Sequence, residues 1–158
     1  MREALFNILG HEISGARLVD LFAGAGTVGF EALSRGAEHV TFVDSDPRAV
    51  QLVHESAVLL GCEDRCSVVR ADALAWTRRR PPELARATAV FLDAPYRDDV
   101  VDSVLAALGE APPPLVVCEH HRARVLPGRP GRLVVVRRAH YGISDLSILR
   151  PADTEAHR

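Results

Sequence analysis

Short apolar runs alternate with helix-like segments along most of the 158-residue chain, and this alternation limits the possible folds more than any other feature. The expected strands are residues 17–21, 39–44, 67–71, 87–92 and 115–119. Helical periodicity predicts helices at residues 2–9, 27–35, 46–60, 73–79 and 98–108. Strands that alternate with helices predict an α/β fold whose parallel sheet carries helices on both faces.

The last part of the chain departs from this alternation. Residues 132–138 and 145–150 read as two strands with no helix between them, which predicts a hairpin. We therefore expect a mostly parallel, seven-stranded sheet with an antiparallel C-terminal hairpin strand, formed by a single domain over residues 1–158. The two prolines at 81–82 predict a loop before the fourth strand.

Composition excludes several classes of protein. No apolar run reaches the ~18 residues of a membrane span, and no signal peptide is visible, so we expect a cytoplasmic protein without a membrane partner. The three cysteines, Cys62, Cys66 and Cys118, show no paired pattern, which fits a reducing compartment and predicts no metal site. Nothing in the sequence indicates an obligate protein partner.

The basic residues are unevenly distributed although the net charge is only −2. All 19 are arginines, and residues 119–150 hold seven of them against two acids. The planar guanidinium suits phosphate recognition, whereas the alternative interpretation is a compositional bias and a solvated face. The candidate RNA-binding residues are Arg78, Arg122, Arg124, Arg137 and Arg138.

A glycine-rich turn, Asp20-Leu-Phe-Ala-Gly24-Ala-Gly26-Thr-Val-Gly29, connects the first strand to the following helix. Glycine there lets the backbone approach a ligand closely, and the helix start offers free N–H groups. The spacing of the three glycines, with Asp44 further on, also fits a dinucleotide fingerprint. A NAD-dependent oxidoreductase therefore stays open as an alternative.

Acidic residues end the first four strands, at Asp20, Asp44, Asp72 and Asp93. Parallel strands place these ends at one edge of the sheet, where an acidic rim would repel a pyrophosphate. S-adenosylmethionine fits better, because its sulfonium, ammonium, ribose hydroxyls and adenine amine all favour acceptors. We expect Asp44 to bind the ribose hydroxyls, Asp72 the adenine amine and the Ala73 N–H the ring edge. The predicted cofactor-binding residues are Asp20, Phe22, Ala23, Gly24, Gly26, Asp44, Ser45, Asp72, Ala73 and Asp93.

The tetrapeptide Asp93-Ala94-Pro95-Tyr96 follows the fourth strand and resembles the (Asp/Asn/Ser)-Pro-Pro-(Tyr/Phe) motif of methyltransferases that act on planar exocyclic amines. The lone pair of such a nitrogen is delocalised into the ring, so it is a poor nucleophile. We expect the Asp93 carboxylate and the Ala94 carbonyl to accept its two N–H groups and aim its lone pair at the methyl group. Stacking of Tyr96 on a base would contribute ~1–3 kcal/mol.

The same residues bear on other activities. A 5-methylcytosine methyltransferase needs a Pro-Cys nucleophile, but Cys62, Cys66 and Cys118 follow Gly, Arg and Val. Methylation of adenine N6 in DNA or RNA, or of a glutamine side chain, stays open because the Asp-x-Pro-Tyr chemistry is shared. A non-catalytic cofactor-binding or RNA-binding module is the remaining alternative.

Four blocks of sequence together resemble the bacterial RsmD-type family. They are Arg2-Glu-Ala-Leu-Phe-Asn-Ile-Leu, the stretch from Asp20 to Ala32, the Asp93 tetrapeptide, and Tyr141-Gly-x-Ser-x-Leu-Ser-Ile. The resemblance implies a Rossmann-like class I methyltransferase that uses S-adenosylmethionine to methylate the N2 of a guanine in small-subunit ribosomal RNA. Its expected partner is ribosomal RNA or the assembling small subunit.

Two features of the sequence depart from the family pattern. Family members usually carry a proline where this chain has Ala94, although the backbone carbonyl acceptor survives the change. They also usually begin some tens of residues earlier, with a basic segment leading into the helix at residues 2–9. We therefore expect the usual N-terminal extension to be missing.

Overall fold

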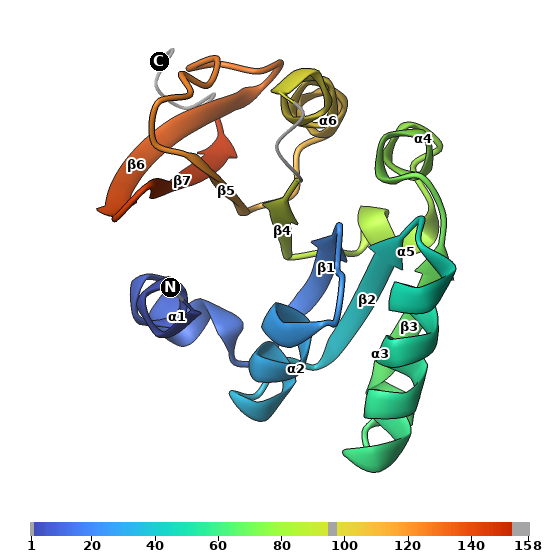
Figure 1. Cartoon of the computed structure of the whole chain (residues 1–158). Helices are drawn as coiled ribbons and strands as arrows, with labels where there is room; N and C mark the ends of the chain where they lie inside the picture. The colour runs from blue at the N-terminus through green and yellow to red at the C-terminus, as the bar shows by residue number, and fades with distance from the viewer. Residues whose placement is uncertain (1, 95–97, 153–158) are drawn as a thin grey trace.

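The computed structural model describes residues 2–94 and 98–152, which contain one seven-stranded sheet (Figure 1). Its strands are β1 (Arg17–Leu21), β2 (His39–Asp44), β3 (Cys66–Arg70), β4 (Ala89–Asp93), β5 (Val116–His121), β6 (Leu133–Tyr141) and β7 (Ser144–Pro151). The spatial order is β3-β2-β1-β4-β5-β7-β6, with β1 to β5 parallel and β7 antiparallel to both neighbours. The predicted parallel sheet with an antiparallel hairpin is confirmed.

Helices connect the parallel strands as the alternation predicts. They are α1 (Arg2–Leu9), α2 (Thr27–Ser34), α3 (Pro47–Leu59), α4 (Ala73–Arg78), α5 (Pro82–Ala85) and α6 (Asp98–Glu110), with 3-10 turns at Gly10–Ile13 and Glu63–Arg65. The α3 helix begins at a cap, because Asp46 Oδ1 accepts from the Arg48 N–H at 2.8 Å. The loop predicted at the two prolines is shorter than expected. Pro82 opens α5, where a proline lacks no needed N–H.

Two hydrophobic cores lie on opposite faces of the sheet. Helices α1, α2 and α3 pack on one face through residues such as Phe6, Leu33 and Val53. Helices α4, α5 and α6 cover the other face, where Trp76 and Leu105 are buried. Because helices cover both faces, β1 and β4 are each buried at four of their five positions.

The order of the strands reverses between β1 and β4. From β1 the chain runs outward through β2 to β3, then returns to place β4 on the other side of β1 (Figure 1). In such sheets a crevice forms beyond the carboxyl ends of the strands at this switch point. Asp20 lies in β1 and Asp93 ends β4, so both acids flank the switch point.

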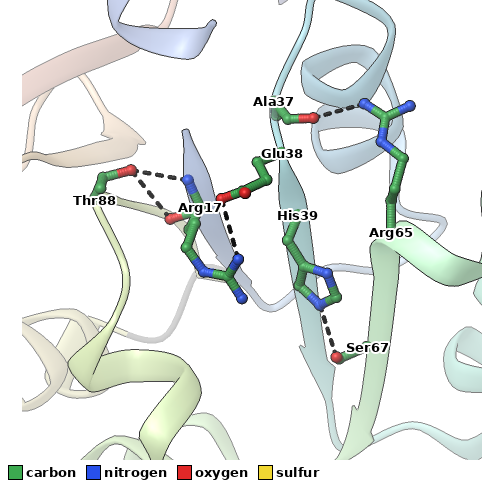
Figure 2. Close-up of polar contacts among 7 residues, drawn as sticks. All are labelled: Arg17, Ala37, Glu38, His39, Arg65, Ser67 and Thr88. Atoms are coloured by element: carbon green, nitrogen blue, oxygen red, sulfur yellow. Dashed lines mark hydrogen bonds and ion pairs between the residues drawn. The ribbon is translucent and has the colours of Figure 1, made fainter. Parts of the chain in front are cut away.

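Polar side chains connect the opposite, amino-terminal edge of the sheet (Figure 2). The Arg17 N–H donates to Thr88 Oγ1 at 2.9 Å, and its guanidinium pairs with Glu38 at 3.1 Å. His39 Nε2 lies 2.8 Å from Ser67 Oγ, which links β2 to β3. The Arg65 guanidinium donates to the carbonyl oxygens of Leu33 and Ala37, at 3.0 and 2.6 Å. These contacts hold the strand starts together.

Two features are absent from the described residues. None of their helices is both long enough and apolar enough to cross a membrane. Their His, Cys, Asp and Glu side chains form no group of three or more that could hold a metal ion.

Candidate active site

The glycine turn between β1 and α2 has a left-handed backbone at three positions. Phe22, Gly24 and Gly26 have φ values of 60°, 56° and 81°. A Cβ placed on Gly24 would meet no atom within 4 Å, so the space beside this backbone is open. The turn therefore offers a ligand close access to the main chain. Phe22 has a backbone conformation that is rare for a residue other than glycine.

The third glycine of the motif has a different role. A Cβ on Gly29 would lie 2.2 Å from Cε1 of Phe42 in β2, far inside contact distance. Gly26 is also crowded, since its Cβ would lie 2.8 Å from the Phe30 ring. Gly29 therefore lets α2 pack closely against the sheet, whereas Gly24 leaves open space for a ligand.

Asp44, at the end of β2, holds the glycine turn in place. One carboxylate oxygen accepts from the Gly24 N–H at 2.8 Å and the other accepts from the Asp46 N–H at 2.9 Å. The residue is half-buried, and each oxygen keeps a further lone pair for a ligand. The contact to ribose hydroxyls stays a prediction, but the side chain lies beside the open turn where that role needs it.

Asp20 is the most unusual group of the site. The residue is only 2% exposed, and the nearby backbone N–H of Gly29 opposes the rise of its pKa. Its Oδ2 is buried and has no hydrogen-bond partner among the described residues. Burial, with smaller additions from the charges of Asp93 and Asp44, raises the pKa of Asp20 well above its ordinary value. A buried, unsatisfied carboxylate oxygen is costly unless a donor or a cation is supplied from outside the described chain.

Asp93 ends β4 next to the switch point. Desolvation raises the pKa of its carboxyl, although the residue keeps substantial contact with solvent on its open side. In register, Asp20 lies beside Phe91, so Asp93 stands two residues further along and on the same face. Ala94 is half-buried next to it. The other two predicted catalytic residues, Pro95 and Tyr96, lie outside the described residues.

The remaining predicted cofactor residues lie either in the glycine turn or just after β2 and β3. Phe22 and Ala23 lie in the turn, and the Ala23 N–H donates to the Val43 carbonyl at 3.0 Å. Asp72 caps α4 by accepting from the Ala75 N–H at 2.9 Å. Asp72 and Ser45 are exposed, while Ala73 is buried. Asp72 follows β3, the strand at the sheet edge, so its contact with the adenine amine stays a prediction.

The predicted RNA-binding arginines do not form one cluster. Arg122, Arg137 and Arg138 are exposed on the side of the sheet formed by β5, β7 and β6, whereas Arg78 is exposed on α4. Arg124 is different, because its side chain is only 12% exposed and pairs with Asp102 of α6 at 2.7 Å. The fold therefore uses Arg124 to join the loop after β5 to α6.

Glu119 lies beside the candidate site and is not among the residues predicted from the sequence. It lies in β5 directly beside Asp93 of β4 in the parallel register, and it is half-buried. Desolvation raises the pKa of Glu119, and the charge of Asp93 adds to this effect. The signal was available in the sequence, because Glu119 ends the predicted fifth strand as Asp93 ends the fourth.

Comparison with known proteins identifies the family of this chain. A family model described as conserved hypothetical protein 95 matches residues 1–150. The putative rRNA methyltransferase YlbH of Bacillus subtilis is 34% identical over 154 residues, which cover 95% of this chain and 84% of that protein. The ribosomal RNA small subunit methyltransferase D of Escherichia coli K12 is 36% identical over 112 residues. That match covers 68% of this chain but only 52% of the relative's length.

A solved structure confirms the fold. The putative methyltransferase yhhF from Escherichia coli superposes with a TM-score of 0.84 at 26% identity, covering 97% of this chain and 86% of that one. The fold predicted from the alternation of strands and helices is therefore the Rossmann-like class I methyltransferase fold. With the family model covering nearly the whole sequence, the chain belongs to the conserved hypothetical protein 95 family, the RsmD-type methyltransferases.

Proposed function

We propose that this protein transfers the methyl group of S-adenosylmethionine to the exocyclic N2 amine of a guanine in small-subunit ribosomal RNA, releasing S-adenosylhomocysteine. The observation that carries the proposal is the group of carboxylates of Asp20, Asp44 and Asp93 around an open glycine turn, in a chain of this family. Ribosomal RNA is made and assembled in the cytoplasm of bacteria, so we place the protein there.

The residues of the turn fit this cofactor. The unsatisfied Oδ2 of Asp20 fits a ligand that brings a positive charge or a donor, and S-adenosylmethionine carries a sulfonium, an ammonium and hydroxyl groups. Open space at Gly24 fits close approach of the ligand to the backbone. When bound, the cofactor supplies an electrophilic methyl group. A NAD-dependent reaction fits less well, because the same carboxylates would face a pyrophosphate.

Asp93 acts on the amine. Its carboxylate accepts one N–H of the target nitrogen and the Ala94 carbonyl accepts the other, which directs the nitrogen lone pair away from both acceptors. Transfer would form the N–C bond and break the methyl–sulfur bond, leaving the thioether product, and the nitrogen would then lose a proton to the Asp93 carboxylate. The raised pKa of Asp93 makes it a better proton acceptor than an ordinary aspartate. Most of the rate enhancement comes from positioning and from the fixed charge.

Exposed arginines support binding of RNA. Arg122, Arg137 and Arg138 form no ion pair with any other described residue, so their guanidinium groups are available to phosphates. Phosphate contacts of this kind make affinity fall steeply with salt. Arg78 contributes only if the bound RNA also reaches α4.

One experiment tests the proposed function. The protein is incubated with methyl-tritiated S-adenosylmethionine and, in separate reactions, with unmethylated small ribosomal subunits, free small-subunit RNA or DNA, followed by nucleoside analysis. We expect label in N2-methylguanosine from the subunits or the free RNA. Label in N6-methyladenosine instead would show that the target base is adenine and not guanine. No label in any nucleic acid, together with binding of NAD but not S-adenosylhomocysteine in calorimetry, would overturn the proposal.

A further inference from the structure

Two carboxylates stand side by side at the end of the sheet where the target amine is expected. Asp93 of β4 and Glu119 of β5 are direct partners in the parallel register. Partners in neighbouring parallel strands project to the same face, and the strands lie about 4.8 Å apart. Asp20 projects to this face too, because its register partner Phe91 stands two residues before Asp93 in β4. Its buried Oδ2 has no partner among the described residues, so the proposed cofactor site adjoins this face.

The Glu119 carboxylate has no structural contact among the described residues. Glu119 is half-buried, and its carboxylate makes no hydrogen bond or ion pair with any other residue in the described part of the chain. Other acids that follow strands have backbone partners: Asp44 binds two N–H groups and Asp72 caps a helix. A half-buried carboxylate without a partner beside a second carboxylate is unfavourable, so a ligand that donates hydrogen bonds to both would be favoured.

Two adjacent acceptors can bind some nucleobases and not others, because the bases differ in the ring atom next to their exocyclic amine. Guanine presents the N2 amine next to the N1–H, which makes two neighbouring donors. Adenine presents its N6 amine next to N1, and cytosine its N4 amine next to N3, and both of these ring nitrogens are acceptors. A carboxylate beside the amine-binding Asp93 therefore attracts guanine and repels the other two bases.

We propose that Glu119 is a specificity-determining residue, whose carboxylate accepts the N1–H of the target guanine while Asp93 accepts an N2–H. The proposal rests on the proposed function, since it names a contact of the same substrate. Glu119 is one methylene longer than Asp93, which suits the ring N–H while the shorter side chain holds the amine. Glu119 is half-buried, and partial burial strengthens a hydrogen bond of this kind because less water competes for it.

The test uses 2-aminopurine, which keeps the amine of guanine but has an unprotonated, accepting N1. RNA spanning the nucleotide that accepts label in the experiment above is made with either guanine or 2-aminopurine at that position. It is presented in the same form, free or assembled, that accepts label. Glu119→Gln keeps the size of the side chain but lets its amide donate to N1. We expect kcat/KM on guanine RNA to fall about tenfold to a hundredfold, and the preference for guanine over 2-aminopurine to fall by a similar factor.

Two further variants separate specificity from structure. Glu119→Asp keeps the charge but shortens the reach, and should also lower kcat/KM on guanine RNA. Glu63→Gln makes the same chemical change at an exposed position in the 3-10 turn at Glu63–Arg65, and should alter neither rate nor preference. Thermal unfolding and binding of S-adenosylhomocysteine show whether each variant is folded.

The outcomes distinguish this inference from the proposed function. If the unmodified chain forms no N2-methylguanosine, the proposed function fails first. If it forms N2-methylguanosine but Glu119→Gln lowers kcat/KM on guanine RNA and on 2-aminopurine RNA by the same factor, or leaves both values unchanged, the specificity role is wrong while the proposed function stands. A selective loss on guanine RNA supports the contact between Glu119 and the guanine N1–H.

Discussion

The two edges of the central sheet use polar residues in opposite ways. At the amino-terminal edge, Arg17, His39 and Ser67 all have partners, and each contact joins neighbouring segments (Figure 2). At the carboxyl-terminal edge, Asp20 keeps a buried oxygen without a partner among the described residues, and the Glu119 carboxylate has none there. The paired groups of the first edge stabilise the fold. The unpaired carboxylate oxygens of the second edge lower its stability but can accept hydrogen bonds from a ligand.

The two edges also differ in how their charges are arranged. At the amino-terminal edge Arg17 pairs with Glu38, so opposite charges meet. The carboxyl-terminal edge gathers carboxylates, and the pKa of Asp20 rises because burial and like charges disfavour its ionised form. Such an arrangement is typical of functional sites, where stability is exchanged for binding. The following predictions test this contrast, from the largest expected effect to the smallest.

Replacing Asp93 by Asn should have the largest effect. The variant keeps the shape of the side chain but loses the charge that accepts the N–H and receives the proton. We expect kcat for methyl transfer to fall by about 10²–10³, as for loss of one preorganised electrostatic contact. The melting temperature should change little, and binding of S-adenosylhomocysteine shows whether the cofactor site is intact. Asp64→Asn, at an exposed position, is the matched control. Equal rates in Asp93→Asn and the unmodified chain would remove Asp93 from catalysis.

Replacing Asp44 by Ala should weaken the cofactor site. The change removes the acceptor for the Gly24 and Asp46 N–H groups and so loosens the turn. We expect the dissociation constant for S-adenosylhomocysteine to rise about tenfold to a hundredfold in calorimetry, the equivalent of about 1.4–2.8 kcal/mol. Glu38→Ala removes a paired carboxylate from the opposite edge and should leave the constant unchanged. An unaltered constant in Asp44→Ala would exclude Asp44 from the pocket.

Replacing Asp20 by Asn should stabilise the fold while weakening the cofactor site. Because the folded-state pKa of Asp20 is raised, the unfolded chain ionises first as pH rises, and stability falls above about pH 4. Removing the charge should therefore add about 1 kcal/mol to the free energy of unfolding at pH 8, and nothing below the ordinary aspartate pKa. Denaturant unfolding across pH 3–8 measures this difference. A variant less stable than the unmodified chain at pH 8 would contradict it.

Replacing Ser67 by Ala should have the smallest effect. The change removes the hydrogen bond between Ser67 and the half-buried His39 at the amino-terminal edge. We expect a loss of about 0.5–1 kcal/mol of unfolding free energy and no change in the dissociation constant for S-adenosylhomocysteine. Weaker cofactor binding in this variant would show that the two edges are coupled rather than separate in function.

Much of the fold could be predicted because its signals are local. Short apolar runs become strands, Asp46-Pro47 starts α3, and Gly36 follows α2 with a φ of 102°. The prediction of a loop at Pro81-Pro82 is wrong from Pro82 onward, because a proline suits both a loop and the first turn of a helix. The roles of Gly24 and Gly29 could not be separated from sequence, since the second depends on the Phe42 ring in another strand.

The sequence by itself determined the order of strands and helices, the glycine turn and the acids at the strand ends, because each depends on neighbours along the chain. Only the tertiary structure decided which acids act together. Parallel pairing places Glu119 beside Asp93, and the packing of α2 buries Asp20 without a partner for its second oxygen among the described residues. It also joined Arg124 to Asp102, which removes that arginine from the exposed surface. Register and burial depend on contacts between residues far apart in sequence, and these are set by the packing of the whole domain.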